Sequence, residues 1–292
     1  MITLNHDPDG YITPVELRNG RYYKREDLLR FSNGVNGKVR TSLHLAQKAK
    51  DAGADALVYG GSVHAPALGR VASAAAYMGM DSYLVIGSDI STARRHDTVR
   101  VAEEAGAEFL RAKVAYNPAL QKLARETAER SGGSIVQIPY GVSHPDSWSA
   151  DEVQAFLHED SRQVDSVLQT GIETLVIPFG SANAALGILY GLSWYDDAPE
   201  VILVGVGPDR REWLFERLRY VGVTKRQLPK ITYLPLHPHF AEYKDRMPEH
   251  QDGIDFHPTY EGKVVRFLDT LKPTWWTTRD DSTCMWIVGG PL

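Results

Sequence analysis

The sequence predicts an α/β protein in which mainly parallel sheets are flanked by helices. Between residues 55 and 138, four short apolar strands alternate with three helices, and a second alternation follows from residue 150 to residue 288. Such alternation is typical of parallel sheets with right-handed crossover connections. With 292 residues, the chain can form one large domain or two closely associated ones.

The expected elements of the first half follow from apolar spacing and turn residues. Residues 1–40 contain short strand candidates separated by Gly, Pro and Asn. Helix 41–52 has Leu43, Ala46 and Ala49 on one face, with Thr41 or Ser42 as a cap. The elements expected after it are a strand at 55–59, an alanine-rich helix at 66–78, a strand at 82–87, a helix at 91–105, a strand at 107–111, a helix at 118–131 and a strand at 134–138.

The second half repeats this alternation without an internal repeat of fixed period. A turn-rich segment at residues 139–145 is the best boundary between the two blocks. Residues 235–253 are mostly polar and contain His237, His239 and His250, with His257 just beyond. The expected elements are a long helix at 150–169, a strand at 174–178, a helix opening at 180–187, a strand at 201–206, a helix at 210–221, a strand at 231–234, a helix at 260–271 and a strand at 284–288.

The composition is that of an ordinary globular protein. The net charge of -5 argues against binding nucleic acid through a general basic surface. The single cysteine, Cys284, excludes an internal disulfide and a cysteine-rich metal site. The first residues lack the pattern of a secretory signal, and no apolar run reaches the roughly 20 residues that span a membrane. We therefore expect a cytoplasmic protein.

Lys38 is a candidate for covalent chemistry. It follows two Asn-Gly steps, at residues 33–34 and 36–37, and stands where a helix begins. Asn-Gly steps favour tight turns, so the loop carries the lysine at its end. An amine in such a place can be desolvated and lose its proton, which is what Schiff-base chemistry requires. The alternative is a solvated lysine at a helix start.

A loop of small residues follows the strand at 174–178. Small side chains let backbone N–H groups approach an anion, and the helix N-terminus favours negative charge. The loop matches neither a Walker loop nor the G-x-G-x-x-G fingerprint, so a tight turn without a ligand is the alternative. Its residues are Gly180, Ser181, Ala182, Asn183 and Ala184.

Two other places offer polar groups. Ser62 and His64 lie in the loop after the strand at 55–59, where open α/β sheets bind ligands, although a helix cap and a surface histidine would look the same. Tyr260 and Glu261 open a helix, and the helix dipole alone would favour that glutamate. The pair His237 and His239 would suggest a metal on a strand. Flanking prolines and the lack of a third ligand lead us to expect no metal site.

These motifs together resemble the fold type II pyridoxal-phosphate enzymes, in particular the branch of 1-aminocyclopropane-1-carboxylate (ACC) deaminase and D-cysteine desulfhydrase. The resemblance extends in order and spacing over nearly the whole chain. It rests on Lys24-Arg25-Glu26-Asp27, Asn36-Gly37-Lys38-Val39-Arg40, Asp51 to Val58, Ile138 to Ser143, Val176 to Ser181, Pro258 to Lys263 and Gly289-Gly290.

The resemblance implies a role for each candidate. Lys38 would form the Schiff base with pyridoxal 5'-phosphate, and residues 180–184 would bind its phosphate. Glu261 would face the pyridine nitrogen and strengthen the electron sink, and Tyr260 would donate or accept a proton near the substrate. His64 is expected to contact the cofactor or the substrate; Ser62 and Tyr140 are expected to contact the substrate.

The sequence departs from the family where the substrate carboxylate binds. The family's Ser-Asn pair is replaced by Ala65-Pro66 or, if the loop slides, by Ser62 and His64. The usual asparagine partner of the ring hydroxyl is absent in either alignment. The segment at 233–253 does not align with the second active-site tyrosine of ACC deaminase, for which Tyr243 is the candidate. These departures suggest a changed substrate.

The resulting expectation is an enzyme with two α/β domains, a smaller one at 41–141 and a larger one formed by 1–40 and 142–292. We expect elimination or deamination of an amino-acid-like small molecule by a homodimer. A β-replacement synthase on the same scaffold is the near alternative. A catalytically inactive binding protein with this fold is a third possibility, favoured by the altered loop and disfavoured by the retention of Lys38, Tyr260 and Glu261. Missing nucleotide fingerprints disfavour a nucleotide-binding protein without the cofactor.

Overall fold

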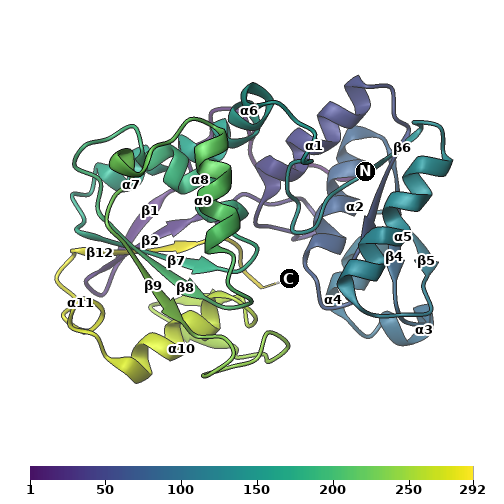
Figure 1. The fold of residues 1–292 in the computed structure, drawn as a ribbon. Coiled ribbons are helices and arrows are strands. Elements are labelled where there is room, and N and C mark those ends of the chain that lie inside the picture. Colours follow the sequence, from purple (N-terminus) through teal and green to yellow (C-terminus); the bar gives the residue numbers. More distant parts are fainter. Residues whose placement is uncertain (292) are drawn as a thin grey trace. The chain divides into compact units, whose positions relative to one another are not determined.

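A computed structural model describes residues 1–291 of the chain (Figure 1). The chain divides into two compact units, the first formed by residues 1–8 and 29–148 and the second by residues 9–28 and 149–291. Each unit contains its own mainly parallel sheet flanked by helices. The predicted α/β fold class is therefore confirmed.

The first unit is built on a four-stranded sheet with the order β5-β4-β3-β6, in which every pair is parallel. The inner strand β3 is completely buried, and α5 packs so closely that a Cβ on Gly60 would lie 2.2 Å from the carbonyl oxygen of Leu120. The strands are β3 (Ala56–Gly60), β4 (Asp81–Ile86), β5 (Glu108–Arg111) and β6 (Ile135–Gln137). The helices are α1 (Val39–Asp51), α2 (Ala67–Met78), α3 (Ile90–Ala93), α4 (Asp97–Glu104) and α5 (Asn117–Arg130).

The second unit is built on a six-stranded sheet with the order β1-β2-β12-β7-β8-β9. Only β1 and β2 pair antiparallel, through a turn at Asn19-Gly20 whose φ angles are both positive, as a tight hairpin requires. The strands are β1 (Val15–Arg18), β2 (Arg21–Arg25), β7 (Thr174–Phe179), β8 (Glu200–Gly205), β9 (Ile231–Pro235) and β12 (Thr283–Ile287), with a separate hairpin of β10 (Glu249–Gln251) and β11 (Ile254–Phe256). The helices are α6 (Ala150–Ser161), α7 (Val164–Leu168), α8 (Asn183–Leu192), α9 (Arg211–Tyr220), α10 (Glu261–Leu271) and α11 (Thr274–Thr277), with 3-10 turns η1 (Glu26–Leu28) and η2 (Lys225–Gln227).

Two predicted helices are each divided in the structure, so those predictions were wrong in their extent. The helix expected at 91–105 becomes α3 and α4, because His96 adopts an extended backbone and begins a new helix. The helix expected at 150–169 becomes α6 and α7. Tight i,i+3 turns at Gln163 and Asp165 interrupt the regular helix there. The hairpin β10–β11 and the short α11 were not predicted, since elements of three or four residues carry almost no periodic signal.

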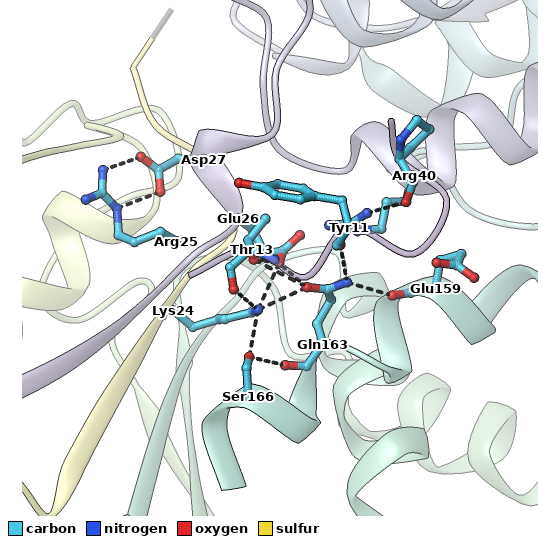
Figure 2. A network of polar contacts seen from close by, with 11 residues as sticks. Tyr11, Thr13, Lys24, Arg25, Glu26, Asp27, Arg40, Glu159, Gln163 and Ser166 are labelled. Atoms are coloured by element: carbon cyan, nitrogen blue, oxygen red, sulfur yellow. Dashed lines mark hydrogen bonds and ion pairs between the residues drawn. The ribbon is translucent and has the colours of Figure 1, made fainter. Parts of the chain in front are cut away.

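Gln163, at the break between α6 and α7, is part of a buried polar network (Figure 2). The side chain of Gln163 donates to the carbonyl of Tyr11 and accepts from the backbone N–H of Thr13. Lys24, which is fully buried, donates to the Thr13 carbonyl at 2.6 Å and to Gln163 and Ser166 at 3.0 Å. Within the second unit, this network holds residues 9–28 against α6 and α7.

None of the helices within residues 1–291 is both long enough and apolar enough to cross a membrane.

Candidate active site

In the first unit, Lys38 begins α1 in a left-handed backbone conformation, with φ 53° and ψ 29°. The hydroxyl groups of Thr41 and Ser42 donate to its carbonyl oxygen at 3.0 and 2.7 Å, which secures the first helical turn. The Nζ atom extends away from the helix and donates to the carbonyl oxygen of Gly141 at 2.8 Å. The amine is therefore held by the segment that follows β6.

That segment is itself strained. Val142 is fully buried and has a φ angle of 56°, which is an outlier for a β-branched residue. A residue held in such a region costs about 1–3 kcal/mol, and strained residues cluster at functional sites. Lys38 and Val142 both have a positive φ angle. The hydrogen bond from Lys38 to Gly141 thus joins one of these residues to the neighbour of the other. Tyr140, which is expected to contact the substrate, precedes Gly141 in the chain and is 42% exposed.

Ser62 and His64 lie in the loop that follows β3. The Ser62 hydroxyl accepts from the backbone N–H of His64 at 3.3 Å, and the Ser62 N–H donates to Oδ1 of Asn117 at 3.1 Å. The exposed His64 ring lies edge-on to the ring of His96, with 4.5 Å between the ring centroids. The hydroxyl and the N–H group of Ser62 therefore help to fix the conformation of the loop.

In the second unit, the loop at 180–184 connects β7 to α8. Ala182 is buried and has a φ angle of 71°, so the chain turns sharply just before the helix begins at Asn183. The first N–H groups of a helix have no acceptor within it, and they create positive potential at its N-terminus. A Cβ on Gly180 would lie 3.2 Å from the Tyr260 ring, which only a shift of that ring would relieve. The loop thus has the shape of an anion cradle.

Glu261 is fixed at the carboxyl end of β12. Its side chain is buried, and Oε1 accepts from the backbone N–H groups of Val288 at 2.9 Å and Gly289 at 3.3 Å. Hydrogen bonds from N–H groups to a carboxylate oxygen stabilise its negative charge. The predicted carboxylate is therefore rigidly placed by two backbone donors that are distant in sequence.

Tyr260 forms a pair with Tyr243. Their hydroxyl oxygens lie 2.7 Å apart and their rings meet edge-on, with 6.2 Å between the centroids. The Tyr243 ring also covers Gly207, where a Cβ would lie 3.3 Å from it, and the His257 ring lies 5.1 Å from that of Tyr260. Gly207 and His257 were not predicted. A usable signal was present for Gly207, because it follows β8 at the edge where open α/β sheets bind ligands.

Two histidines in and just after the polar segment 235–253 have separate partners. His250 pairs with Asp255 at 2.7 Å, and His257 accepts from the N–H of Thr259. Across residues 1–291, no three His, Cys, Asp or Glu side chains come together as metal ligands.

No protein-family model matches the chain. Among characterised proteins, it is similar to the O-seryl-dTMP PLP-dependent decarboxylase of Salmonella phage ViI, with 24% identity over 348 positions that cover 97% of this chain and 81% of that protein.

Among solved structures, it is similar to an ACC deaminase homologue, with a TM-score of 0.76, 21% identity and coverage of 97% of this chain and 90% of that one. Maize serine racemase is similar with a TM-score of 0.61, 13% identity and coverage of 96% and 88%. Cysteine synthase of Entamoeba histolytica has a TM-score of 0.62, 14% identity and coverage of 100% and 85%. The chain therefore has the fold type II architecture that its motifs predicted.

Proposed function

We propose that this chain is a pyridoxal-phosphate-dependent enzyme that acts on an amino acid or an amino-acid-like substrate. The observation that carries the proposal is the placement of Lys38. It stands at the N-terminus of α1 with a left-handed backbone conformation, and its amine donates to the carbonyl of Gly141. The fold of an ACC deaminase homologue and the similarity to a decarboxylase described as PLP-dependent support the same reading.

The side chains and backbone of the second unit fit this cofactor. The loop at 180–184 offers small residues and the N-terminus of the ten-residue helix α8, which suits a phosphate. The backbone N–H groups of this loop would supply the donors. Glu261, buried and held by two backbone N–H groups, suits a protonated ring nitrogen. When bound, pyridoxal phosphate withdraws electrons from the Cα atom of an amino acid.

The chain's own residues then have distinct tasks. Lys38 anchors the cofactor and, once released, its amine can move a proton at the substrate Cα atom. Tyr260 can hold or move a second proton at its hydroxyl, which is already hydrogen bonded to that of Tyr243. Tyr140, Ser62 and His64 are proposed to contact the substrate.

Elimination or deamination with loss of ammonia is the first reaction that we propose, and β-replacement is the near alternative on the same scaffold. A second candidate is decarboxylation, in which the Cα–carboxylate bond breaks, carbon dioxide leaves and a proton is added at Cα. Two observations favour it. The loop after β3 has Ala65-Pro66, or Ser62 and His64 if the loop slides, in place of a Ser-Asn pair that would hold the carboxylate, and the phage relative is described as a decarboxylase.

The deciding experiment begins with borohydride reduction of protein supplied with pyridoxal phosphate, followed by peptide mass spectrometry. We expect a stable pyridoxyl group on the peptide that contains Lys38. A group found only on surface lysines, or none, would reject the cofactor assignment.

Turnover assays of amino acids and of serine linked through its oxygen to a nucleotide then separate the reactions. Release of ammonia indicates elimination, and release of carbon dioxide indicates decarboxylation. Binding without turnover of any amino-acid substrate would favour the inactive binding protein.

We also propose that the protein is a cytoplasmic homodimer. Light scattering should then report about twice the chain mass of 32.5 kDa.

A further inference from the structure

Lys263 is buried at the start of α10, close to the tyrosine pair. Its side chain is 0% exposed, and Nζ donates to the carbonyl oxygens of Glu242 at 2.6 Å and Tyr243 at 3.0 Å. Removing an ammonium group from water is expensive, and two carbonyl groups recover only part of that cost. Burial accordingly lowers the pKa of Lys263, while the charge of Asp245 opposes the shift.

The two carbonyl groups belong to a turn whose other hydrogen bonds are internal. The N–H of Asp245 donates to the Glu242 carbonyl at 3.1 Å, and the Asp245 carboxylate accepts from the Glu242 N–H at 2.8 Å. The turn therefore presents its carbonyl oxygens to the ammonium group. It is an otherwise irregular segment between β9 and β10, with little regular backbone bonding to define its position.

The same segment also contacts the start of α10 and the residues just before it. The N–H of Met247 donates to the carbonyl of Pro258 at 2.8 Å, and a Cβ on Gly262 would lie 2.2 Å from the Met247 carbonyl oxygen. These backbone contacts hold residue 247. Lys263 holds residues 242 and 243, five and four residues earlier, and so acts directly on the backbone of Tyr243.

We propose that Lys263 is a positioning residue that holds the hydroxyl of Tyr243 against that of Tyr260. Tyr260 and Lys263 lie on the same helical turn, so one turn places a candidate proton-transfer group and also fixes its hydrogen-bond partner. Lys263 itself need not touch the substrate. The kinetic consequence rests on the proposed function, whereas the structural consequence does not.

The competing explanation is that Lys263 only stabilises the fold. Lys24 is the matched control, because it is also fully buried in the second unit and also donates to a backbone carbonyl, in the network of Figure 2. Lys24→Met and Lys263→Met make the same chemical change at these two positions. A purely structural role would lower stability at both and leave the tyrosine pair intact in both.

The test uses the full chain with tyrosine labelled at the 13Cζ atom. Tyr243→Phe and Tyr260→Phe assign the two signals. We expect Lys263→Met to move the Tyr260 signal in the same direction as Tyr243→Phe does, and Lys24→Met to leave it in place. An unchanged Tyr260 signal in folded Lys263→Met would overturn the proposal.

Kinetics with a substrate then measure the coupling. Lys263→Met should lower kcat by about 10-fold or more with little change in KM, and should have little further effect in the Tyr243→Phe background. An equal loss in both backgrounds would contradict positioning through Tyr243. If the chain turns over no amino-acid substrate, the proposed function fails while the NMR result still decides the positioning role.

Lys263→Gln, which keeps a neutral donor, replaces the Met variant if that one does not fold. The wild-type chain offers a measurement that needs no variant at position 263. Labelled 15Nζ should give an exchange-protected ammonium signal for Lys263, coupled to the carbonyl carbons of residues 242 and 243. Rapid exchange with water would show that the ammonium group does not hold this turn.

Discussion

The central strand of each unit leads into a helix through a short loop, and the two loops are built differently. After β7, the chain turns through left-handed Ala182 directly into α8, with small residues throughout. After β3, the chain passes exposed His64 and enters α2 through Pro66, whose backbone is already helical, with φ of -58°. The first loop thus consists of small residues at a helix start, and the second carries an exposed histidine side chain.

This difference separates two tasks. Backbone N–H groups are the same whatever side chains the loop carries. A loop that relies on them therefore suits a group that does not change between related enzymes, such as the phosphate of a cofactor. A loop that relies on side chains can be altered to suit one substrate. The second unit is thus the candidate for constant cofactor chemistry. In the first unit, Lys38 is the proposed anchor, and Ser62 and His64 are the proposed residues that select the substrate.

The largest effect is expected at the anchor. Lys38→Ala should abolish the visible absorbance of protein mixed with pyridoxal phosphate and lower turnover by at least about 10³-fold, since no other group supplies the amine. Lys50→Ala is the control, because Lys50 is exposed on the same helix and donates to Met78. Retained absorbance in Lys38→Ala, equal to that of the control, would place the anchor elsewhere.

Alkaline pH should destabilise the second unit. Burial raises the pKa of the Cys284 thiol to about 12, above its unfolded value, so its contribution to stability is complete below the unfolded pKa and is lost as pH rises toward 12. At pH 11 the loss should be about 3 kcal/mol. Burial also raises the pKa of Tyr23, on neighbouring β2, to about 12, which adds to the effect.

Hydrogen exchange followed by peptide mass spectrometry compares the stability of the two units at alkaline pH. Peptides from β2 and β12 should lose protection between pH 8 and pH 11 more than peptides from β3 and β4. Cys284→Ala should flatten the pH dependence in the second unit. Equal loss of protection in both units would contradict the prediction.

Glu261→Gln tests the rigid carboxylate. An amide can still accept from Val288 and Gly289 but carries no charge, so unfolding should become easier by about 1 kcal/mol. Turnover should fall further than cofactor affinity, because the neutral group no longer favours a protonated ring. Urea unfolding and a titration with pyridoxal phosphate give the two values. Unchanged turnover would remove Glu261 from the site.

The smallest effect is expected at the loop after β3. His64→Gln should raise KM by about two-fold to ten-fold through the loss of one exposed contact, and should leave the affinity for pyridoxal phosphate unchanged. His158→Gln, an exposed histidine on α6, is the control. A loss of cofactor affinity instead would assign His64 to cofactor binding, which is the other role that the sequence suggested for it.

Much of this candidate site could be proposed from the sequence because its signals are local. The Asn-Gly steps before Lys38, the small residues at 180–184 and the glutamate after Tyr260 each lie within a few residues of the feature that reveals them. The extents of the helices at 91–105 and 150–169 could not be predicted. Their apolar periodicity continues past the breaks, whereas the structure interrupts it at His96 and with tight turns near Gln163.

The amino-acid sequence by itself determined the alternation of strands and helices, the fold class and the place of the lysine at a helix start. Only the tertiary structure decided which groups meet: Tyr243 with Tyr260 across 17 residues, and Glu261 with Val288 across 27. Local propensity acts through neighbours along the chain. Contacts of long sequence separation depend instead on strand order and on how closely helices pack, which residue patterns do not specify.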